Sequence, residues 1–530
     1  MSLSALDIVV CSIAVAASIA TGLVIAIRKG VSESSSQFFL AGRRLGWPVV
    51  GASLFATNIG AEHLVGLSGD SYRYGLSAGA VELTTCICLG IACAVLFPYY
   101  IRARVYTIPE YLELRYNRTA RVFFSGLMLV ICIMTKLAFH LSAGALVFHS
   151  LLGWNVMPMV MLMGACVAVI TIIGGFTAVA YTDSVQTAIM IAGCSLMLFI
   201  GLARVGGWHA LVAHMPLAMH VAKPYDDPNY PFIGILLSAL YAGVFYWGMD
   251  QVNVQRVLGA RDLREARSGA MFATLLKLSP IFIFALPGVI AAALYPGRDP
   301  KTTFITLLSD LLPTGVRGLV LAALICALIG SSLSVMNSIS TLIVRDFLLG
   351  FRKNSPEKTQ VLLGRAAILI TTPLAVAAAY LIYTTPDGLY KYLQAVSIYL
   401  VMPVTPAIFF GILSKRMTFQ GAVASAITGT LIASIFVADQ LMNAHGAQIF
   451  PFLHHKLTLN YTYRGLWGTM ITTAVLFAVS YGSRPPELAR VKGLTVDWQS
   501  HSASFEGLSD WRLHWLLLAI ATIAVYAWLW

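Results

Sequence analysis

Apolar stretches about as long as a membrane-spanning helix recur along this chain from Leu6 to Trp530, with only short polar segments between them. An α-helix needs about 20 mostly apolar residues to cross the hydrocarbon core of a bilayer. Hydrophobic residues make up 58% of the 530, and charged residues only 11%. A soluble domain carries about twice that charged fraction. The sequence therefore predicts an all-α, multi-pass membrane protein whose natural surroundings are the lipid bilayer.

We expect about fourteen spans, an even number that leaves both ends of the chain on the same side of the membrane. The first apolar run carries Asp7, lacks a basic segment before it and is long enough for a full span. We interpret it as a retained helix rather than a cleaved signal peptide. The spans are predicted near 5–27, 46–71, 77–101, 120–151, 156–176, 184–205, 231–255, 267–295, 316–344, 362–384, 388–414, 419–440, 465–483 and 511–530.

Basic residues are unevenly distributed among the loops between these spans. Most of the 35 Lys and Arg side chains fall in one set of alternating loops. This asymmetry is the positive-inside bias of an inner or plasma membrane protein. It accounts for the net charge of +12 without a nucleic-acid partner. With the basic loops in the cytoplasm, both termini are predicted on the extracytoplasmic side.

Two spans carry polar interruptions near their middles, at 58–63 (NIGAEH) in the second and at 246–251 (YWGMDQ) in the seventh. The first helices of an inverted repeat of five plus five helices would occur at this separation. Interrupted backbone at membrane depth needs protein or water around it, because lipid cannot satisfy free polar groups. We expect an extra helix and loop at 1–45, repeats at 46–205 and 231–416, and extra helices at 417–530.

Ionisable side chains inside the spans are the sharpest candidates for a functional site. Glu82 and Lys277 each lie several residues inside an apolar span, where a charge costs at least about 2.5–3.5 kcal/mol. They could form a structural ion pair, or both could line a polar cavity. Polar or aromatic side chains occur at comparable depth at Asn58, His63, Tyr246, Trp247 and Gln394. A sugar needs hydrogen-bond donors and acceptors around its hydroxyl groups and aromatic side chains against the face of its ring.

A cation site has separate requirements. Sodium binds oxygen ligands, commonly carbonyls freed where a helix unwinds and hydroxyls from a neighbouring helix. The segment 56–60 could supply carbonyls and the run 330–334 hydroxyls, although such a Ser run also suits close packing of helices. Asp183 is expected on a short loop at the inner side, where it could lie on a cation path or cap the sixth span. Lys136 and His140, in the fourth span, are given no role.

Several stretches resemble signatures of the sodium:solute symporter family, and of its sodium/glucose cotransporter branch in particular. They are 38–43 (FFLAGR), 51–60 (GASLFATNIG), 106–111 (YTIPEY), 174–179 (GGFTAV), 246–251 (YWGMDQ), 254–256 (VQR) and 337–341 (NSIST). The similarity runs to about Arg416 and is mostly a matter of hydropathy after that. The resemblance implies the LeuT-type inverted-repeat fold with additional helices at both ends.

The resemblance also implies roles for individual residues. Sugar carriers of this branch contact their substrate at the positions that match Asn58, His63, Glu82, Tyr246, Trp247, Lys277 and Gln394. The family's sodium site matches the carbonyls of Ala56, Ile59 and Ala327 and the hydroxyl of Ser331. One departure is Gly330, where the branch usually has Ser, so that one hydroxyl ligand is missing. Restoring Ser there is expected to tighten sodium binding.

We therefore expect a sodium-coupled symporter of a monosaccharide such as glucose or galactose, which works by alternating access in the cell membrane. Sodium is the coupling ion, no organic cofactor is expected, and a monomer should suffice for function. Two alternatives remain: a sodium symporter of another small solute such as myo-inositol or sialic acid, and a non-transporting sugar or sodium sensor on the same fold. An enzyme is less favoured, and no P-loop of the form GxxxxGK[ST] occurs.

Overall fold

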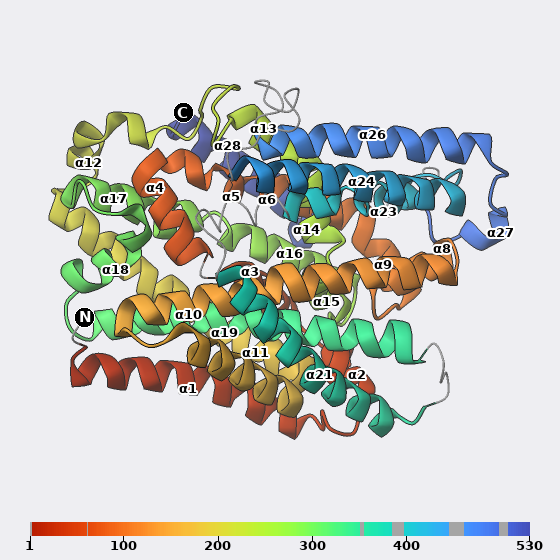
Figure 1. Ribbon diagram of the computed structural model, residues 1–530, viewed down its shortest axis with the longest axis horizontal. Coiled ribbons are helices and arrows are strands. Elements are labelled where there is room, and N and C mark those ends of the chain that lie inside the picture. Colours follow the sequence, from red (N-terminus) through yellow and green to blue (C-terminus); the bar gives the residue numbers. More distant parts are fainter. Residues whose placement is uncertain (1–2, 61, 350–354, 384–396, 445–459, 498–506) are drawn as a thin grey trace.

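The computed structural model describes the chain except for residues 1–2, 61, 350–354, 384–396, 445–459 and 498–506. The described residues are mostly helical and contain no β-strand, as the predicted all-α class requires. Most of the long helices run roughly along the longest axis of the molecule (Figure 1). The helices are α1 (Ala5–Arg28), α2 (Ser35–Leu40), α3 (Trp47–Asn58), α4 (Ser68–Tyr74), α5 (Ala80–Leu83), α6 (Thr85–Ile91), α7 (Phe97–Ala103), α8 (Ile108–Arg115), α9 (Arg118–Val130), α10 (Ala138–Leu152), α11 (Val156–Val205), α12 (Trp208–His214), α13 (Phe232–Ser238), α14 (Val244–Gly248), α15 (Gln251–Leu258), α16 (Leu263–Leu276), α17 (Leu286–Leu294), α18 (Thr303–Thr306), α19 (Val316–Leu342), α21 (Glu357–Tyr383), α23 (Thr405–Leu413), α24 (Phe419–Ala444), α26 (Tyr461–Gly482), α27 (Leu488–Val491) and α28 (Trp511–Trp528).

The helices account for the predicted number of membrane spans. Among the described residues, 10 helices are long and apolar enough to cross a bilayer, or 11 with the bent pair Phe232–Gly248 and Gln251–Leu258. The interrupted pair α3–α4 and the shorter apolar helix Ser397–Leu413 correspond to two more. The 50-residue α11 would be about 75 Å long at 1.5 Å per residue. The non-helical backbone at Gly175 divides it into two parts, each about long enough to cross a hydrocarbon core of about 30 Å.

The turn between the two halves of α11 corrects one prediction. The only non-helical backbone inside α11 is at Gly175, with φ 50° and ψ −157°. Glycine adopts this φ at little cost, and a Cβ there would lie 2.7 Å from the carbonyl oxygen of Phe38. The helix resumes at once, so Asp183 lies within α11 and is fully buried. The predicted loop position and N-cap role of Asp183 are wrong, because a glycine turn joins the two spans without a linker.

Both predicted helix interruptions are present. α3 ends at Asn58, and Ile59 takes an extended conformation with φ −87° and ψ 107°. A π-helical turn, Glu62–Leu67, then leads into α4. α14 and α15 are bent by 54° relative to each other. In each break the backbone leaves the helical hydrogen-bond ladder, so that carbonyl and N–H groups become available to ligands.

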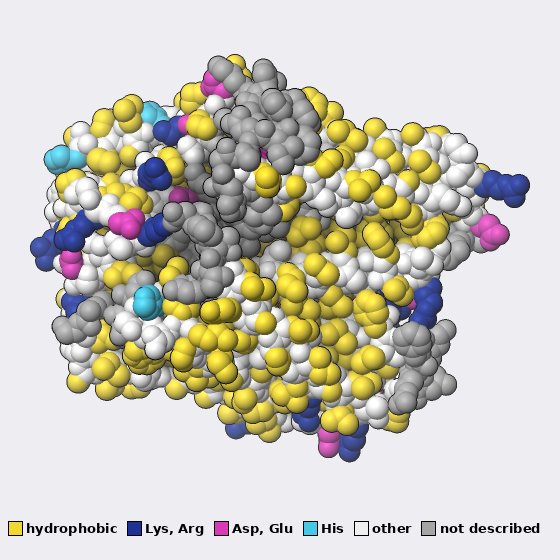
Figure 2. Space-filling view, viewed as in Figure 1, with side chains coloured by type: hydrophobic (Ala, Val, Ile, Leu, Met, Phe, Trp, Pro, Cys, Tyr) yellow, Lys and Arg dark blue, Asp and Glu magenta, His cyan; other side chains and the backbone are white. Residues whose placement is uncertain are grey.

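The outer surface carries the apolar band that a bilayer requires. Hydrophobic side chains cover a broad part of the face shown in Figure 2, where charged side chains are sparse and lie mainly toward the ends of the molecule. Large apolar side chains on the terminal helices are exposed, among them Ile13 on α1 at 64% and Ile523 on α28 at 66%. Such side chains are stable against lipid rather than water.

The two ends of the chain lie near loops that were predicted on one side of the membrane. The carboxylate of Asp7 accepts a hydrogen bond of 2.7 Å from the backbone N–H of Gly315. The carbonyl of Leu529 accepts one of 2.8 Å from the N–H of Val221. The loops at 206–230 and 297–315 therefore sit beside the C-terminus and the N-terminus, as an even number of spans requires.

Candidate functional site

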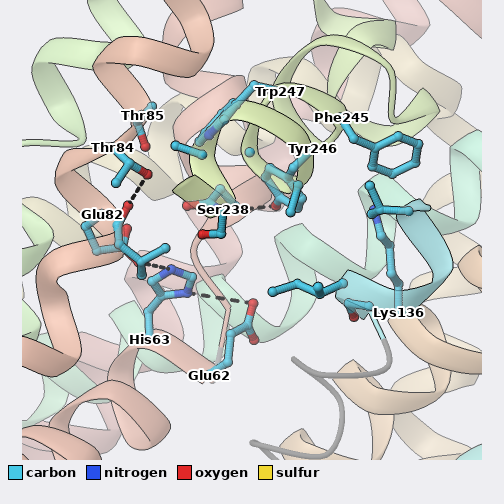
Figure 3. A pocket seen from close by; sticks show the side chains of 18 of the residues that line it. Glu62, His63, Glu82, Thr84, Thr85, Lys136, Ser238, Phe245, Tyr246 and Trp247 are labelled. Carbon is cyan, nitrogen blue, oxygen red and sulfur yellow. Dashed lines mark hydrogen bonds and ion pairs between the residues drawn. The ribbon is translucent and has the colours of Figure 1, made fainter. Parts of the chain in front are cut away.

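A cavity of about 320 Å³ lies among the helices, and residues from both helix breaks line it (Figure 3). Six of the predicted substrate-binding residues lie on its wall, namely Asn58, His63, Glu82, Tyr246, Trp247 and Lys277. Gln394 lies outside the described residues. The structure therefore brings together six side chains that are up to 219 positions apart in the sequence. Whether they bind a substrate stays a prediction.

Helix ends position most of these side chains. Asn58 is the last residue of α3, and His63 lies in the π-helical turn that follows the unwound segment. Lys277 is the C-cap residue of α16, where its charge is favoured by the helix dipole. Tyr246 and Trp247 form the last turn of α14 before the second break. The interruptions thus direct these polar and aromatic side chains into the cavity, whereas an unbroken helix would pack them against other helices.

Hydrogen bonds join the polar side chains of the cavity into one chain. Lys277 donates to both Glu82 and Asn58, and Asn58 in turn donates to the hydroxyl of Tyr246 over 2.9 Å. The Nε2 atom of His63 lies 3.2 Å from Oε1 of Glu82. Only 2% of Lys277 and 7% of Glu82 is exposed. Removing one partner of such a buried ion pair strongly destabilises a protein, because the other charge stays buried without a counter-charge.

Two further contacts between ionisable side chains, one of them an ion pair, were not predicted from the sequence. Lys136, which was given no role, forms an ion pair with Asp250 in the second helix break, and its Nζ lies 5.3 Å from the centre of the Tyr246 ring. Glu62 lies 3.9 Å from Nε2 of His140. Lys136 and His140 are four residues apart in an apolar span and therefore share one helix face. That spacing, together with an acidic residue in each interruption, was the signal available in the sequence.

Aromatic rings form one side of the cavity. The rings of Tyr246 and Trp247 are 5.3 Å apart at an angle of 84°, and the ammonium group of Lys277 lies 5.9 Å from the Trp247 ring. The Tyr246 hydroxyl is held by Asn58, as described above, so its position depends on the end of α3. The two helix breaks are therefore connected directly through these side chains.

One stretch of the sequence, Gly75–Gly79, matches the Gly-x-Ser-x-Gly pattern of an acyl-transfer nucleophile. In that role the serine would stand exposed on a turn between a strand and a helix. Ser77 is instead fully buried in a 3₁₀ turn and donates a hydrogen bond of 3.0 Å to the carbonyl of Tyr74. The stretch is a structural turn.

The residues predicted to bind a cation lie on two helices in direct contact, α3 and α19. The hydroxyl groups of Thr57 on α3 and Ser334 on α19 are 3.2 Å apart. Ser331 lies one turn earlier on α19, where its hydroxyl donates to the carbonyl of Ala327 over 2.8 Å. Since α3 ends at Asn58, the carbonyls of its last turn have fewer helical donors. Oxygen atoms of the type that sodium prefers are thus available on both helices.

Asp183 faces the same junction from α11. Its Oδ2 atom accepts a hydrogen bond of 2.6 Å from Ser53 on α3 and lies 3.6 Å from the guanidinium group of Arg256. Asp183 and Arg256 are both fully buried. The carboxylate therefore belongs to a polar contact between α3, α11 and α15, and its part in a cation path stays a prediction.

Broken helices that meet around a polar cavity within an apolar bundle define a class of protein, the secondary transporters. The family model described as "Sodium:solute symporter family" matches residues 38–429. The chain belongs to this family, as the resemblance implied, and its fold is the LeuT-type inverted repeat with additional helices.

Curated relatives are sodium cotransporters of two kinds. The human sodium/myo-inositol cotransporter is 32% identical over 457 residues, which cover 77% of this chain and 64% of the relative. The zebrafish sodium/glucose cotransporter 4 is 30% identical over 505 residues, which cover 88% of this chain and 77% of the relative. The chain thus spans about two thirds of the length of the inositol carriers that it matches.

Solved structures share the fold at low sequence identity. A Na⁺-coupled sialic acid symporter in a substrate-bound, outward-open state superimposes with a TM-score of 0.78. The two chains are 19% identical, and the match covers 92% of this chain and all of the other. Mhp1, a transporter of the nucleobase-cation-symport-1 family, gives a TM-score of 0.56 at 13% identity, with 86% of this chain covered.

Proposed function

We propose that this protein carries a neutral monosaccharide of the glucose or galactose type across the cell membrane together with sodium, by alternating access. The family consists of sodium-coupled solute transporters, and the relatives include carriers named for glucose and for myo-inositol. Extracytoplasmic termini, a functional monomer and the absence of enzymatic activity belong to the same proposal.

The observation that carries the choice of substrate is the charge pairing within the cavity. Among the residues that the structure describes, both lysines on its wall have a carboxylate partner, with Lys277 beside Glu82 and Lys136 beside Asp250. Burying a charged substrate would require an unpaired charge of opposite sign. The paired groups still offer hydrogen-bond donors and acceptors, which suit the hydroxyl groups of a neutral polyol. This arrangement favours a neutral sugar over a sugar that carries a carboxylate, such as sialic acid.

Myo-inositol is the second candidate, because it is also a neutral cyclic polyol and because inositol carriers are among the relatives. A competition assay separates the candidates: uptake of labelled glucose is measured with an excess of unlabelled galactose, myo-inositol or sialic acid. Competition by hexoses alone supports the monosaccharide. Competition by myo-inositol at lower concentrations than any hexose would shift the assignment to the inositol, and competition by sialic acid would contradict the argument from charge pairing.

The coupling of sodium binding to sugar binding follows from the position of the proposed sodium ligands at the helix break. A sodium ion held by the carbonyls of Ala56 and Ile59 and by α19 would fix the unwound end of α3, which carries Asn58 into the cavity. The same ion would therefore favour the conformation that binds sugar, and linkage makes that effect reciprocal. Rotation of α14 then moves Tyr246 aside, so that both solutes leave inward. Asp183 lies on the proposed route of the ion.

Replacing Ser331 by Ala tests the cation site. The substitution removes one hydroxyl and leaves the carbonyl of Ala327, which that hydroxyl contacts at 2.8 Å. We expect the sodium concentration for half-maximal uptake to rise about tenfold, because each tenfold corresponds to about 1.4 kcal/mol of binding free energy. Ser332→Ala is the matched control, since the Ser332 hydroxyl bonds only the carbonyl of Leu328 in its own helix. Equal sodium dependence in the wild type and Ser331→Ala would place the cation elsewhere.

Substitutions of Tyr246 separate its ring from its hydroxyl group. Tyr246→Phe removes the hydrogen bond of 2.9 Å to Asn58 and keeps the aromatic wall. A loss of about 1 kcal/mol, typical of one hydrogen bond, predicts a decrease in uptake of about fivefold. Tyr246→Ala also removes the ring that must move aside before the solutes leave inward. We therefore expect a sodium leak without sugar, measured as current or as ²²Na⁺ flux. A Tyr246→Ala variant that remains tightly coupled would exclude the gating role.

A further inference from the structure

Gly330 marks a place in α19 where another residue occupies the space of a side chain. A Cβ atom built on Gly330 would lie 2.2 Å from Oε1 of Gln186. Gln186 comes from α11, which packs against α19, and only 1% of it is exposed. A serine at position 330 and Gln186 in its present position would exclude each other. The glutamine therefore fills the volume that a serine side chain would need.

The side-chain amide of Gln186 has no hydrogen-bond partner among the described residues, at either Oε1 or Nε2. Leaving a buried polar group unsatisfied costs about 1–3 kcal/mol, and native proteins contain few such groups. Oδ1 of Asp183 also lacks a hydrogen-bond partner there and would lie 3.3 Å from the same Cβ position. Both of these oxygen atoms lie beside Gly330, and a bound cation would satisfy them.

The glutamine also lies beside the helix that unwinds. Its neighbour Thr187 donates a hydrogen bond of 2.9 Å to the carbonyl of Ala52, one turn before Ala56 on α3. Gly330 is adjacent to Ser331 on α19. Gln186 thus stands at the junction of the two helices to which the cation ligands were assigned.

We propose that the side-chain carbonyl of Gln186 is a ligand of the coupling sodium ion and takes the place of the hydroxyl group that Gly330 lacks. This inference rests on the proposed sodium coupling, and it adds α11 to a site otherwise formed by α3 and α19. Amide oxygens are suitable ligands for hard cations. The unsatisfied amide and the missing hydroxyl then have one explanation.

The structure changes what is expected of Gly330→Ser. From the sequence, a serine would simply restore a ligand. In the structure its Cβ would displace Gln186, so the single substitution exchanges one ligand for another and should not tighten sodium binding. The combination Gln186→Ala and Gly330→Ser provides both the space and the hydroxyl group, and we expect its sodium affinity to return to within about threefold of the wild type.

The experiment uses the purified full-length chain in detergent without sugar. Its thermal unfolding temperature is measured against NaCl concentration, with choline chloride holding the ionic strength constant, because a ligand that binds the native state stabilises it. We expect Gln186→Leu to raise the apparent sodium dissociation constant about tenfold. Gln186→Glu keeps the oxygen atom and should bind sodium at least as well as the wild type. Ser184→Ala is the control on α11, since its hydroxyl bonds only Ala180 in the same helix, over 2.9 Å.

Three results would overturn the inference, each in a recognisable way. Unchanged sodium affinity in Gln186→Leu would show that the glutamine is not a ligand. Equal weakening in Gln186→Leu and Gln186→Glu would show that the amide N–H group matters rather than the oxygen. A wild-type protein whose unfolding temperature does not respond to sodium would overturn the proposed sodium coupling itself, and with it this inference.

Discussion

Replacing Glu82 by Gln is expected to lower sodium-driven sugar uptake about a hundredfold, a change of about 2.8 kcal/mol, while the protein still reaches the membrane. The carboxylate is the ion-pair partner of Lys277 and lies 3.2 Å from Nε2 of His63. A neutral amide leaves the buried ammonium group without a counter-charge, and breaking such a pair costs about 3–5 kcal/mol. The initial rate of labelled sugar uptake into proteoliposomes measures the effect.

Two further variants distinguish a binding role from a structural one. Glu33→Gln makes the same chemical change on an exposed residue beyond α1, and it should leave uptake unchanged. The double variant Glu82→Gln with Lys277→Met removes both charges, so it should recover thermal stability without recovering uptake. If Glu82→Gln alone transports within about twofold of the wild type, a change of less than 0.5 kcal/mol at about 1.4 kcal/mol per tenfold, Glu82 has no part in the substrate site.

Replacing Asp250 by Asn is expected to destabilise the protein by about 3–5 kcal/mol, because it leaves the buried Lys136 unpaired. Asp250 is 4% exposed and forms the ion pair with Lys136 next to the second helix break. Asn retains the ability to cap α15, as Asp250 does through the N–H of Val252. The single amide oxygen then serves the cap, so the substitution removes both the charge and the hydrogen bond of 3.2 Å that Asn253 donates to Oδ2 of Asp250. Thermal unfolding of the detergent-solubilised protein measures the loss.

A second substitution should reverse this loss. Adding Lys136→Met removes the unpaired charge, so the double variant should melt close to the wild type. The matched control is Asp262→Asn at the N-cap of α16, where the side chain is 50% exposed and accepts from the N–H of Glu265 over 2.9 Å. Asp262 also lies 3.3 Å from the exposed guanidinium group of Arg261. We expect a change in stability well below that of Asp250→Asn, since exposed ion pairs contribute about 0–1 kcal/mol. A double variant no more stable than Asp250→Asn would mean that the ion pair does not support the fold.

The fold was predictable from the sequence because its signals are local. Long apolar runs specify spanning helices, and the polar residues at 58–63 and 246–251 specify the two breaks that the structure contains. The position of Asp183 was not predictable in this way. The predicted fifth span ends at 176, next to the turn at Gly175, but the sixth was predicted to begin only at 184. A turn made by Gly175 alone needs no polar linker, so the helix resumes before 184 and includes Asp183.

The candidate site was predictable only in part. Six cavity residues were chosen from their depth in the spans and from the family resemblance, and the structure brings those six together. The partners Asp250 and Glu62 were missed, because a pairing such as Lys136 with Asp250 joins residues 114 positions apart and depends on the packing of helices. The conflict between Gly330 and Gln186 likewise depends on the contact between α11 and α19, which no sequence pattern specifies.

The central claim is that sodium entry drives sugar accumulation through the cavity between the broken helices. The direct test is uptake of labelled glucose or galactose into proteoliposomes with an inward sodium gradient and an inside-negative potential of about 100 mV, which is worth about 2.3 kcal/mol per charge. The account predicts accumulation of up to about 50-fold from the voltage alone, lost when potassium replaces sodium. Uptake that only equilibrates, or that is equal in sodium and potassium, would contradict it.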